Sequence, residues 1–234
     1  MVEVSDLRAG YGGIEALSGV DVSVPTGGVY AILGPNGAGK STLLSVIAGL
    51  HQPTAGDVHI AGVRVTGARC DQLARRGVCL VPEGRSVFPN LTVRENLWLA
   101  THSGTSLAAI ESAAYAAFPR LGERCKQLAG TMSGGEQQML ALARAIATKP
   151  SLVMVDELSM GLAPIIVGQL YESIAELARN GLTVIVVEQF ARTVLGVAER
   201  GALMVGGRIV LEGTTEELQG ALTSAYLGEG VTTS

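Results

Sequence analysis

The chain has 234 residues, of which 47% are hydrophobic, and it carries a formal net charge of −4. This length and hydrophobic content suffice for one α/β domain with a full core and a small inserted subdomain. The acidic balance and the lack of long basic runs argue against nucleic acid as a partner. The three cysteines, Cys70, Cys79 and Cys125, have neither the number nor the spacing of a disulfide framework or a zinc site.

The sequence predicts a cytosolic protein. Its first six residues include two acids and do not resemble a signal peptide. No apolar stretch approaches the roughly 20 residues that a membrane-spanning helix needs. Short β-branched runs such as residues 184–187 are typical of buried parallel strands instead. We therefore expect any contact with a membrane to come through a partner.

The first part of the chain is rich in predicted strands, separated by glycine and proline. These strands cover residues 1–7, 20–24, 29–33, 57–60 and 63–65. The strand at 29–33 is followed by a Gly-rich loop and by a helix that ends at Gly49. This order is that of a βα unit.

The middle of the chain, residues 84–147, has the pattern of an inserted helical subdomain. The pattern is helical from residue 92 to about 128, and an amphipathic helix covers 139–147. We predict that this block interrupts a core made of residues 1–83 and 148–234.

After Pro150, strands and helices alternate again. The predicted elements are a strand at 152–155, a helix at 165–180, a strand at 182–187, a helix at 190–198 and a hairpin of strands 202–205 and 208–212. This alternation predicts a parallel sheet with right-handed connections and covering helices. The fold class is therefore α/β, with an antiparallel β-subdomain in the N-terminal part.

A phosphate-binding loop follows the strand at 29–33. It fits the pattern G-x-x-x-x-G-K-[ST] and consists of Gly34, Pro35, Asn36, Gly37, Ala38, Gly39, Lys40, Ser41 and Thr42. Its backbone N–H groups and the start of the next helix suit the β-phosphate of a nucleotide. Lys40 would reach the β- and γ-phosphate oxygens, and the Ser41 hydroxyl would bind Mg²⁺. A Gly-rich turn that merely begins a helix would not require Lys40 and Ser41.

Two acids end the apolar strand at 152–155. A carboxylate at the end of a buried strand is costly unless it serves a cation, so we expect Asp156 to hold Mg²⁺ together with Ser41. Glu157 would emerge at the carboxyl edge of the sheet and is the candidate to polarise the attacking water. Two solvated acids at a turn would explain this pair alone, but not the pair together with Lys40 and Ser41.

The base of the nucleotide is predicted to be adenine. Tyr11, in a Gly-rich segment, is a candidate to stack on it, and a tyrosine in a hairpin turn is the alternative. No Asn-Lys-x-Asp segment, the guanine reader of GTPases, follows the loop. ATP is therefore the expected nucleotide.

A second anion site is predicted at the start of the helix after residue 132. Ser133 and Glu136 form a capping box, which explains these two residues structurally. Capping does not explain Gly134 and Gly135 in the first turn, where each glycine costs up to about 1 kcal/mol relative to alanine. We infer that bare backbone N–H groups there donate to a phosphate held by another subunit.

Together these segments resemble the ATP-binding subunits of ABC transporters. The Walker A motif lies at 34–42, the signature at 133–137 and Walker B at 152–156. The resemblance covers essentially the whole chain. It implies a RecA-like P-loop NTPase fold and a head-to-tail dimer, in which two ATP molecules lie between one subunit's Walker A and the other's signature.

Finer features resemble the branched-chain amino-acid importer ATPases of the LivF type. The matching segments are residues 81–97 around the Q-loop, 159–164 in the D-loop and 187–189 at the switch. By position, the resemblance implies that Glu83 faces the metal and Gln189 faces the γ-phosphate. Three residues depart from the general ABC pattern: Glu83 replaces the usual glutamine, Gln189 the usual histidine and Leu158 the usual proline. The first two also occur in the LivF type.

The resemblance implies an ATP-hydrolysing subunit that drives uptake of branched-chain amino acids. The implied partners are a second, related ATPase, a transmembrane permease and, indirectly, a solute-binding protein, and the implied location is the cytoplasmic face of the cell membrane. Glutamine cannot become cationic as histidine can, so we expect slow hydrolysis at the site with Gln189 and a histidine in the second ATPase. Val87, Phe88 and Leu91 are candidates for the permease surface or for the core of the helical subdomain.

Three alternatives stay open. An ATPase of a sister importer for urea, amides or other small polar solutes would carry similar motifs. A soluble ABC ATPase, such as an iron–sulfur assembly subunit, is compatible with the length, although residues 81–97 and 159–164 favour the importer. A regulatory subunit that binds ATP without splitting it is opposed by Glu157 and mildly favoured by Gln189.

Overall fold

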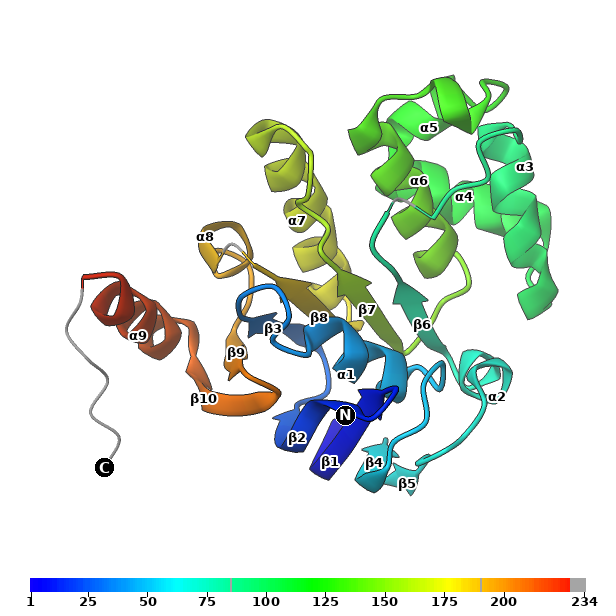
Figure 1. The fold of residues 1–234 in the computed structure, drawn as a ribbon. Helices are drawn as coiled ribbons and strands as arrows, with labels where there is room; N and C mark the ends of the chain where they lie inside the picture. The colour runs from blue at the N-terminus through cyan, green and yellow to red at the C-terminus, as the bar shows by residue number, and fades with distance from the viewer. Residues whose placement is uncertain (85, 190, 228–234) are drawn as a thin grey trace.

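The computed structural model describes residues 1–84, 86–189 and 191–227, and it consists of two β-sheets with the helices around them (Figure 1). The larger sheet has the strand order β10-β9-β3-β8-β7-β6, and the smaller sheet has the order β2-β1-β4-β5. None of the helices in the described ranges is long and apolar enough to cross a membrane.

The smaller sheet is antiparallel and is formed by the first part of the chain. Its strands are β1 (Val2–Tyr11), β2 (Ile14–Val24), β4 (Ala55–Ile60) and β5 (Val63–Arg64). Val2 and Val4 are buried and Glu3 between them is exposed, as in a sheet with one face on the core. The predicted antiparallel β-subdomain is confirmed. β1 and β2 are longer than predicted because they form a hairpin around Gly12 and Gly13, both at positive φ.

The larger sheet is parallel except at one edge, where β10 runs antiparallel to β9. Its strands are β3 (Gly28–Leu33), β6 (Val78–Val81), β7 (Leu152–Asp156), β8 (Thr183–Glu188), β9 (Arg200–Val205) and β10 (Arg208–Thr214). Every residue of β7 and β8 is buried, which is the pattern of parallel strands covered on both faces. The predicted parallel sheet is confirmed.

Two hydrophobic cores lie on the two faces of the larger sheet. Along β3, Tyr30 and Ile32 pack with the smaller sheet and with helix α1 (Lys40–Ile47). Ala31 and Leu33 belong to the other core, which includes α7 (Pro164–Arg179) and the helices between β6 and β7. Because successive strand residues face opposite sides, the larger sheet is the central layer of the fold.

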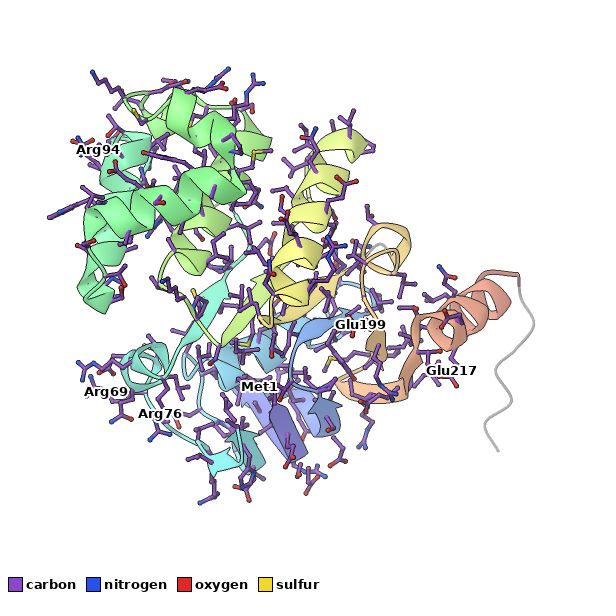
Figure 2. All side chains as sticks on the ribbon, turned by 180° about the vertical axis from the view of Figure 1, so that it is seen from behind. Met1, Arg69, Arg76, Arg94, Glu199 and Glu217 are labelled. Atoms are coloured by element: carbon purple, nitrogen blue, oxygen red, sulfur yellow. The ribbon has the colours of Figure 1, made fainter. Side chains whose placement is uncertain are left out.

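The helices between β6 and β7 form a group beside the larger sheet (Figure 1). They are α3 (Val93–Trp98), α4 (Leu107–Ala117), α5 (Pro119–Glu123) and α6 (Gly134–Ile146), with 3-10 turns at Leu99–Ser103 and Ala129–Thr131. Asn96 of α3 is fully buried and donates hydrogen bonds to the carbonyls of Phe88 and Leu91, which holds the loop entering the group. Arg94, on the same group in Figure 2, pairs with Glu111 of α4 at 2.8 Å. The predicted inserted helical subdomain is confirmed, and its limits at residues 84 and 147 stay a prediction.

Several elements differ from the sequence prediction. The prediction lacks β6, α2 (Cys70–Arg75) and α9 (Thr215–Leu227). Short apolar runs such as β6 do not by themselves distinguish a strand from a helix. Figure 2 shows Arg69 and Arg76 at the two ends of α2. The predicted helix at 190–198 begins outside the described residues, and α8 covers only Ala191–Val194, since a turn containing Gly196 leads from it to β9.

Candidate nucleotide-binding site

Four neighbouring parallel strands end together at one edge of the larger sheet. The register pairs Leu33 of β3 with Glu188 of β8, and Val187 of β8 with Asp156 of β7, while β6 lies beside β7. The predicted site residues that follow or end these strands are residues 34–42 after β3, Gln189 after β8, Asp156 and Glu157 at β7, and Glu83 after β6. Strand register therefore gathers them at the carboxyl edge, where open α/β sheets bind ligands.

The loop after β3 requires glycine for steric reasons within the chain. A Cβ on Gly34 would lie 2.1 Å from the carbonyl oxygen of Met204, and a Cβ on Gly39 would lie 2.5 Å from that of Ala16. Gly39 also has a φ of 102° at the N-cap of α1, which side chains rarely allow. No described side chain caps α1, so its first N–H groups face the loop with no side-chain acceptor. A helix start of this kind favours an anion.

Lys40 is buried inside the loop. Its side chain is 3% exposed, and its Nζ donates to the carbonyls of Gly34 at 3.0 Å and Pro35 at 3.1 Å. The same Nζ lies 3.6 Å from Oε1 of Glu157. The Lys40 ammonium group therefore lies between the loop carbonyls and Glu157, the candidate catalytic acid.

Asp156 is a buried carboxylate with an incomplete set of partners. Burial raises its pKa, a side-chain hydrogen bond from Ser41 lowers it, and the charges of Glu157 and Glu83 raise it further. Its Oδ1 has no hydrogen-bond partner among the described residues. A buried carboxylate oxygen of this kind, beside a hydroxyl and two further acids, fits a cation such as Mg²⁺. The described ranges contain no group of three or more His, Cys, Asp or Glu side chains that could hold a metal ion.

Glu157 has a strained backbone, with φ at 46°. Such conformations cost roughly 1–3 kcal/mol for residues other than glycine and cluster at functional sites. The Glu157 N–H donates to the carbonyl of Val187 in β8 at 3.0 Å, and its side chain is only 13% exposed. Leu158 is fully buried in the core beside the sheet. The departure from proline at position 158 therefore contributes an apolar side chain to the core.

Gln189 is exposed directly after β8, next to the segment after β7. The residue before it, Glu188, is 2% exposed and accepts hydrogen bonds from Ser159 and Tyr171. The sequence reasoning did not select Glu188. The signal that could have found it is the one used for Asp156, an acid at the end of an apolar strand.

Tyr11 is the last residue of β1, immediately before the Gly12-Gly13 turn, and is 53% exposed. Tyr11 therefore lies at a hairpin turn, as the alternative interpretation of the sequence expects. Its ring stacks on His51, with 4.3 Å between ring centroids and 27° between planes, and His51 Nε2 hydrogen-bonds the carbonyl of Gly10. Its stacking on adenine stays a prediction.

The predicted capping box at the start of α6 is present. The Glu136 carboxylate accepts from the Ser133 N–H at 2.9 Å and from the Ser133 hydroxyl at 2.8 Å. It also pairs with Arg120 at 3.0 Å and with Arg124 at 3.2 Å. Burial raises the pKa of Glu136, but the hydrogen bonds from Ser133 and Arg120 and the charge of Arg124 outweigh it and hold the pKa below its ordinary value.

Gly135 has a reason within the chain that the sequence did not reveal. A Cβ on Gly135 would lie 2.4 Å from Cγ2 of Ile166 in α7. Packing against α7 is therefore a second reason for Gly135, and the approach of another subunit's phosphate stays a prediction. Residues 133–136 lie with the helical group in Figure 1, away from β3 and α1, so the structure does not bring them to the loop at 34–42 of the same chain.

Comparisons with known proteins agree with this arrangement. Residues 17–159 match the family model described as ABC transporter. The chain is 42% identical to the high-affinity branched-chain amino acid transport ATP-binding protein BraG of Pseudomonas aeruginosa, over 97% of this chain and 100% of BraG. It is 31% identical to BraF of the same organism, over 98% of each chain. The fold matches the ADP conformation of MJ1267, an ATP-binding cassette of an ABC transporter, with a TM-score of 0.87, 27% identity and coverage of 98% and 97%.

The family match spans the loop at 34–42, the start of α6 and the end of β7. The likeness to a whole cassette confirms the predicted fold class, with its two sheets and its helical subdomain. The chain therefore belongs to the ABC transporter family, as one of its ATP-binding ATPase subunits.

Proposed function

We propose that this chain hydrolyses ATP to drive uptake of branched-chain amino acids through a separate membrane permease. The observation that carries the proposal is the sheet edge, where strand register joins Lys40, Asp156 and Glu157 at one site. The full-length similarity to BraG supports the choice of solute, because BraG is named for branched-chain amino-acid transport. It favours this solute class over urea or amides, and an importer over iron–sulfur assembly.

At the site, each group of the chain has a separate task. The loop N–H groups and the start of α1 bind the β-phosphate, and Lys40 exchanges its bonds to loop carbonyls for phosphate oxygens. Ser41 and Asp156, with the charge of Glu83 nearby, would hold Mg²⁺, which would supply positive charge to the phosphates. Glu157 polarises the attacking water, and Gln189 donates a hydrogen bond to the γ-phosphate.

The start of α6 serves the ATP of a second subunit in a head-to-tail dimer. A glutamate in the first turn would repel a phosphate, but Arg120 and Arg124 neutralise Glu136. The N–H groups of Gly134 and Gly135 then donate to an anion at the helix N-terminus.

The second subunit is a related ATPase rather than a second copy. Two different relatives of this chain, BraG and BraF, occur in one organism under the same transport description, which supports a pair. Gln189 lacks a titratable proton near neutral pH, so this chain's own Walker A site turns over slowly. In the pair, its signature completes the faster site.

A groove between the sheet and the helical group supports docking of the permease. The groove has a volume of about 910 Å³ and lies between α2, β6, the 3-10 turn Leu99–Ser103 and α6, with Arg144 on its wall. Phe88 is 49% exposed and lies under the Arg144 guanidinium, 5.0 Å from ring centroid to Cζ. Val87 is partly buried against the core, and Leu91 is partly buried too. Of the three predicted docking residues, Phe88 is thus the best candidate, and docking puts the chain at the cytoplasmic face of the membrane.

Reconstitution tests the proposal. The purified chain alone should hydrolyse ATP weakly, and the rate should rise at least about tenfold when a BraF-like ATPase and the permease are added in lipid vesicles. Leucine uptake into the vesicles should require ATP and stop when Glu157→Gln replaces the wild-type chain. Full activity of the chain alone would contradict the heterodimer, and uptake of urea in place of leucine would contradict the solute.

A further inference from the structure

A buried carboxylate ties the segment after β7 to the strand next to it. Glu188, the last residue of β8, is 2% exposed. Its Oε1 accepts from the Ser159 N–H at 2.9 Å and from the Tyr171 hydroxyl of α7 at 2.5 Å. Its Oε2 accepts from the Ser159 hydroxyl at 2.7 Å. No lysine, arginine or histidine in the described ranges forms a salt bridge with it.

The same segment carries the candidate catalytic acid. Glu157 is two residues before Ser159, and the Glu157 N–H donates to the carbonyl of Val187 in β8. Residues 157 and 159 are thus both bonded to the end of β8, one through its backbone and one through Glu188. With its own N–H bonded to β8 and Ser159 bonded to Glu188, Glu157 keeps its strained φ of 46°. Strain of this kind persists only where neighbouring structure over-determines the backbone.

Glu188 also has a position that links two loops. Gln189 follows it directly and is exposed at the site, while Met160 follows Ser159 and is 62% exposed. Three hydrogen bonds join the end of β8 to the segment after β7: two from Ser159 to Glu188 and one from the Glu157 N–H to the carbonyl of Val187. An apolar residue at 188 would fill the space without the cost of a buried charge, but it would leave the Ser159 N–H without its acceptor.

We propose that Glu188 is a positioning residue for ATP hydrolysis: by anchoring Ser159 it holds the Glu157 carboxylate in place and couples it to Gln189. This inference rests on the proposed role of Glu157. Glu188 does not touch the nucleotide, and its effect is on the orientation of the catalytic acid.

The test compares substitutions that keep or remove the anchor in the purified full-length chain. In Glu188→Gln, the amide oxygen accepts from the Ser159 N–H and the Tyr171 hydroxyl, and the amide NH₂ donates to the Ser159 hydroxyl, which can accept. We expect a kcat within about threefold of wild type for this variant. Glu188→Leu removes the anchor, and we expect its kcat to fall at least about tenfold while KM and the Kd for ATP change less than about twofold.

A second readout does not depend on activity. Hydrogen exchange at residues 157–163 should become faster in Glu188→Leu and stay near wild type in Glu188→Gln, whereas exchange at residues 34–42 should not change. Tyr171→Phe is the matched control, because it removes one donor to the same carboxylate and leaves both bonds to Ser159. It should lower thermal stability with kcat within about threefold of wild type.

Three outcomes would overturn the inference. In the first, Glu188→Leu keeps the wild-type kcat while unfolding at a lower temperature, which is a structural role alone. In the second, Glu188→Leu and Tyr171→Phe lower kcat equally.

If Glu188→Leu does not fold, Ser159→Ala decides instead. A kcat of Ser159→Ala unchanged from wild type is the third outcome against the inference, and a loss of about threefold or more at constant KM supports it. Glu157→Gln is measured in parallel, and a wild-type rate in that variant refutes the role of Glu157 itself.

Discussion

The carboxyl edge of the larger sheet and the start of α6 are both phosphate sites in the proposal, but they are built in different ways. At the sheet edge, one chain supplies the loop, a buried cation and the carboxylates, and strand register brings them together. At α6, the chain supplies a helix start whose glutamate is already bonded to Ser133, Arg120 and Arg124. Strand register thus gathers most groups of the first site within one chain. In the proposal, the helix start of α6 adds to the corresponding site of a partner.

The largest expected effect is at the sheet edge and separates hydrolysis from binding. Glu157→Gln should lower kcat at least about 100-fold, because it removes the group that polarises water. The Kd for ATP should change less than about threefold, since the loop and Lys40 carry the binding. Steady-state hydrolysis and nucleotide titration measure the two. Glu172→Gln, an exposed carboxylate on α7, is the matched control, and equal losses in both variants would dismiss a special role of Glu157.

An intermediate effect is expected for Gly135 at the start of α6. It distinguishes packing of this glycine against α7 from binding of a partner's phosphate. Gly135→Ala places a Cβ against Ile166, and overpacking of this kind costs about 1–3 kcal/mol of the free energy of unfolding. ATP binding to the isolated chain should stay at the wild-type level, because Gly135 is not part of its own loop site. Thermal unfolding and nucleotide titration check both statements.

A compensating variant then sharpens the comparison. Gly135→Ala together with Ile166→Ala has room for the new Cβ and should regain part of the lost stability. If the ATPase activity of the assembled dimer is lower than wild type in Gly135→Ala and is not regained in this double variant, Gly135 serves the partner's phosphate. Recovery of both stability and ATPase would mean that Gly135 is needed only for packing against α7.

The smallest expected effect concerns Asp156 and pH. Because burial raises its pKa, the folded chain holds the Asp156 proton more tightly than the unfolded chain does. Its contribution to stability is therefore greatest below the ordinary Asp pKa of about 4 and is lost as pH rises through the raised pKa. Without nucleotide or metal, Asp156→Asn should thus gain thermal stability over wild type at pH 7, and the gain should shrink as the solution is acidified. A stability difference that does not vary with pH would contradict the assignment.

The sequence predicted the sheet edge well because its signals are local. The loop at 34–42 is recognised by its residue types and their spacing, and Asp156 by its position at the end of an apolar strand. The strands β7 and β8 were predictable for the same reason, since a continuous apolar run between polar residues can be recognised without distant information. β6 was missed because four apolar residues carry too little periodicity to identify a strand.

The residues that the sequence missed depend on distant partners. Glu188 acquires its role from Ser159 and Tyr171, which lie 29 and 17 residues away in the chain. Gly135 is required by Ile166, a residue of another helix. Neither relation leaves a spacing pattern in the sequence.

The sequence by itself determined the candidate groups of this protein: a phosphate-binding loop motif, an acid at the end of an apolar strand, a second acid beside it and a capped helix start. Residue type and short spacing suffice for these, because each depends on the backbone of one segment. Only the tertiary structure decided which groups meet, since strand register and helix packing join segments that are far apart in the chain. It put Asp156 and Lys40 at one edge, placed residues 133–136 away from the loop at 34–42, and bonded Glu188 to the segment that contains Glu157.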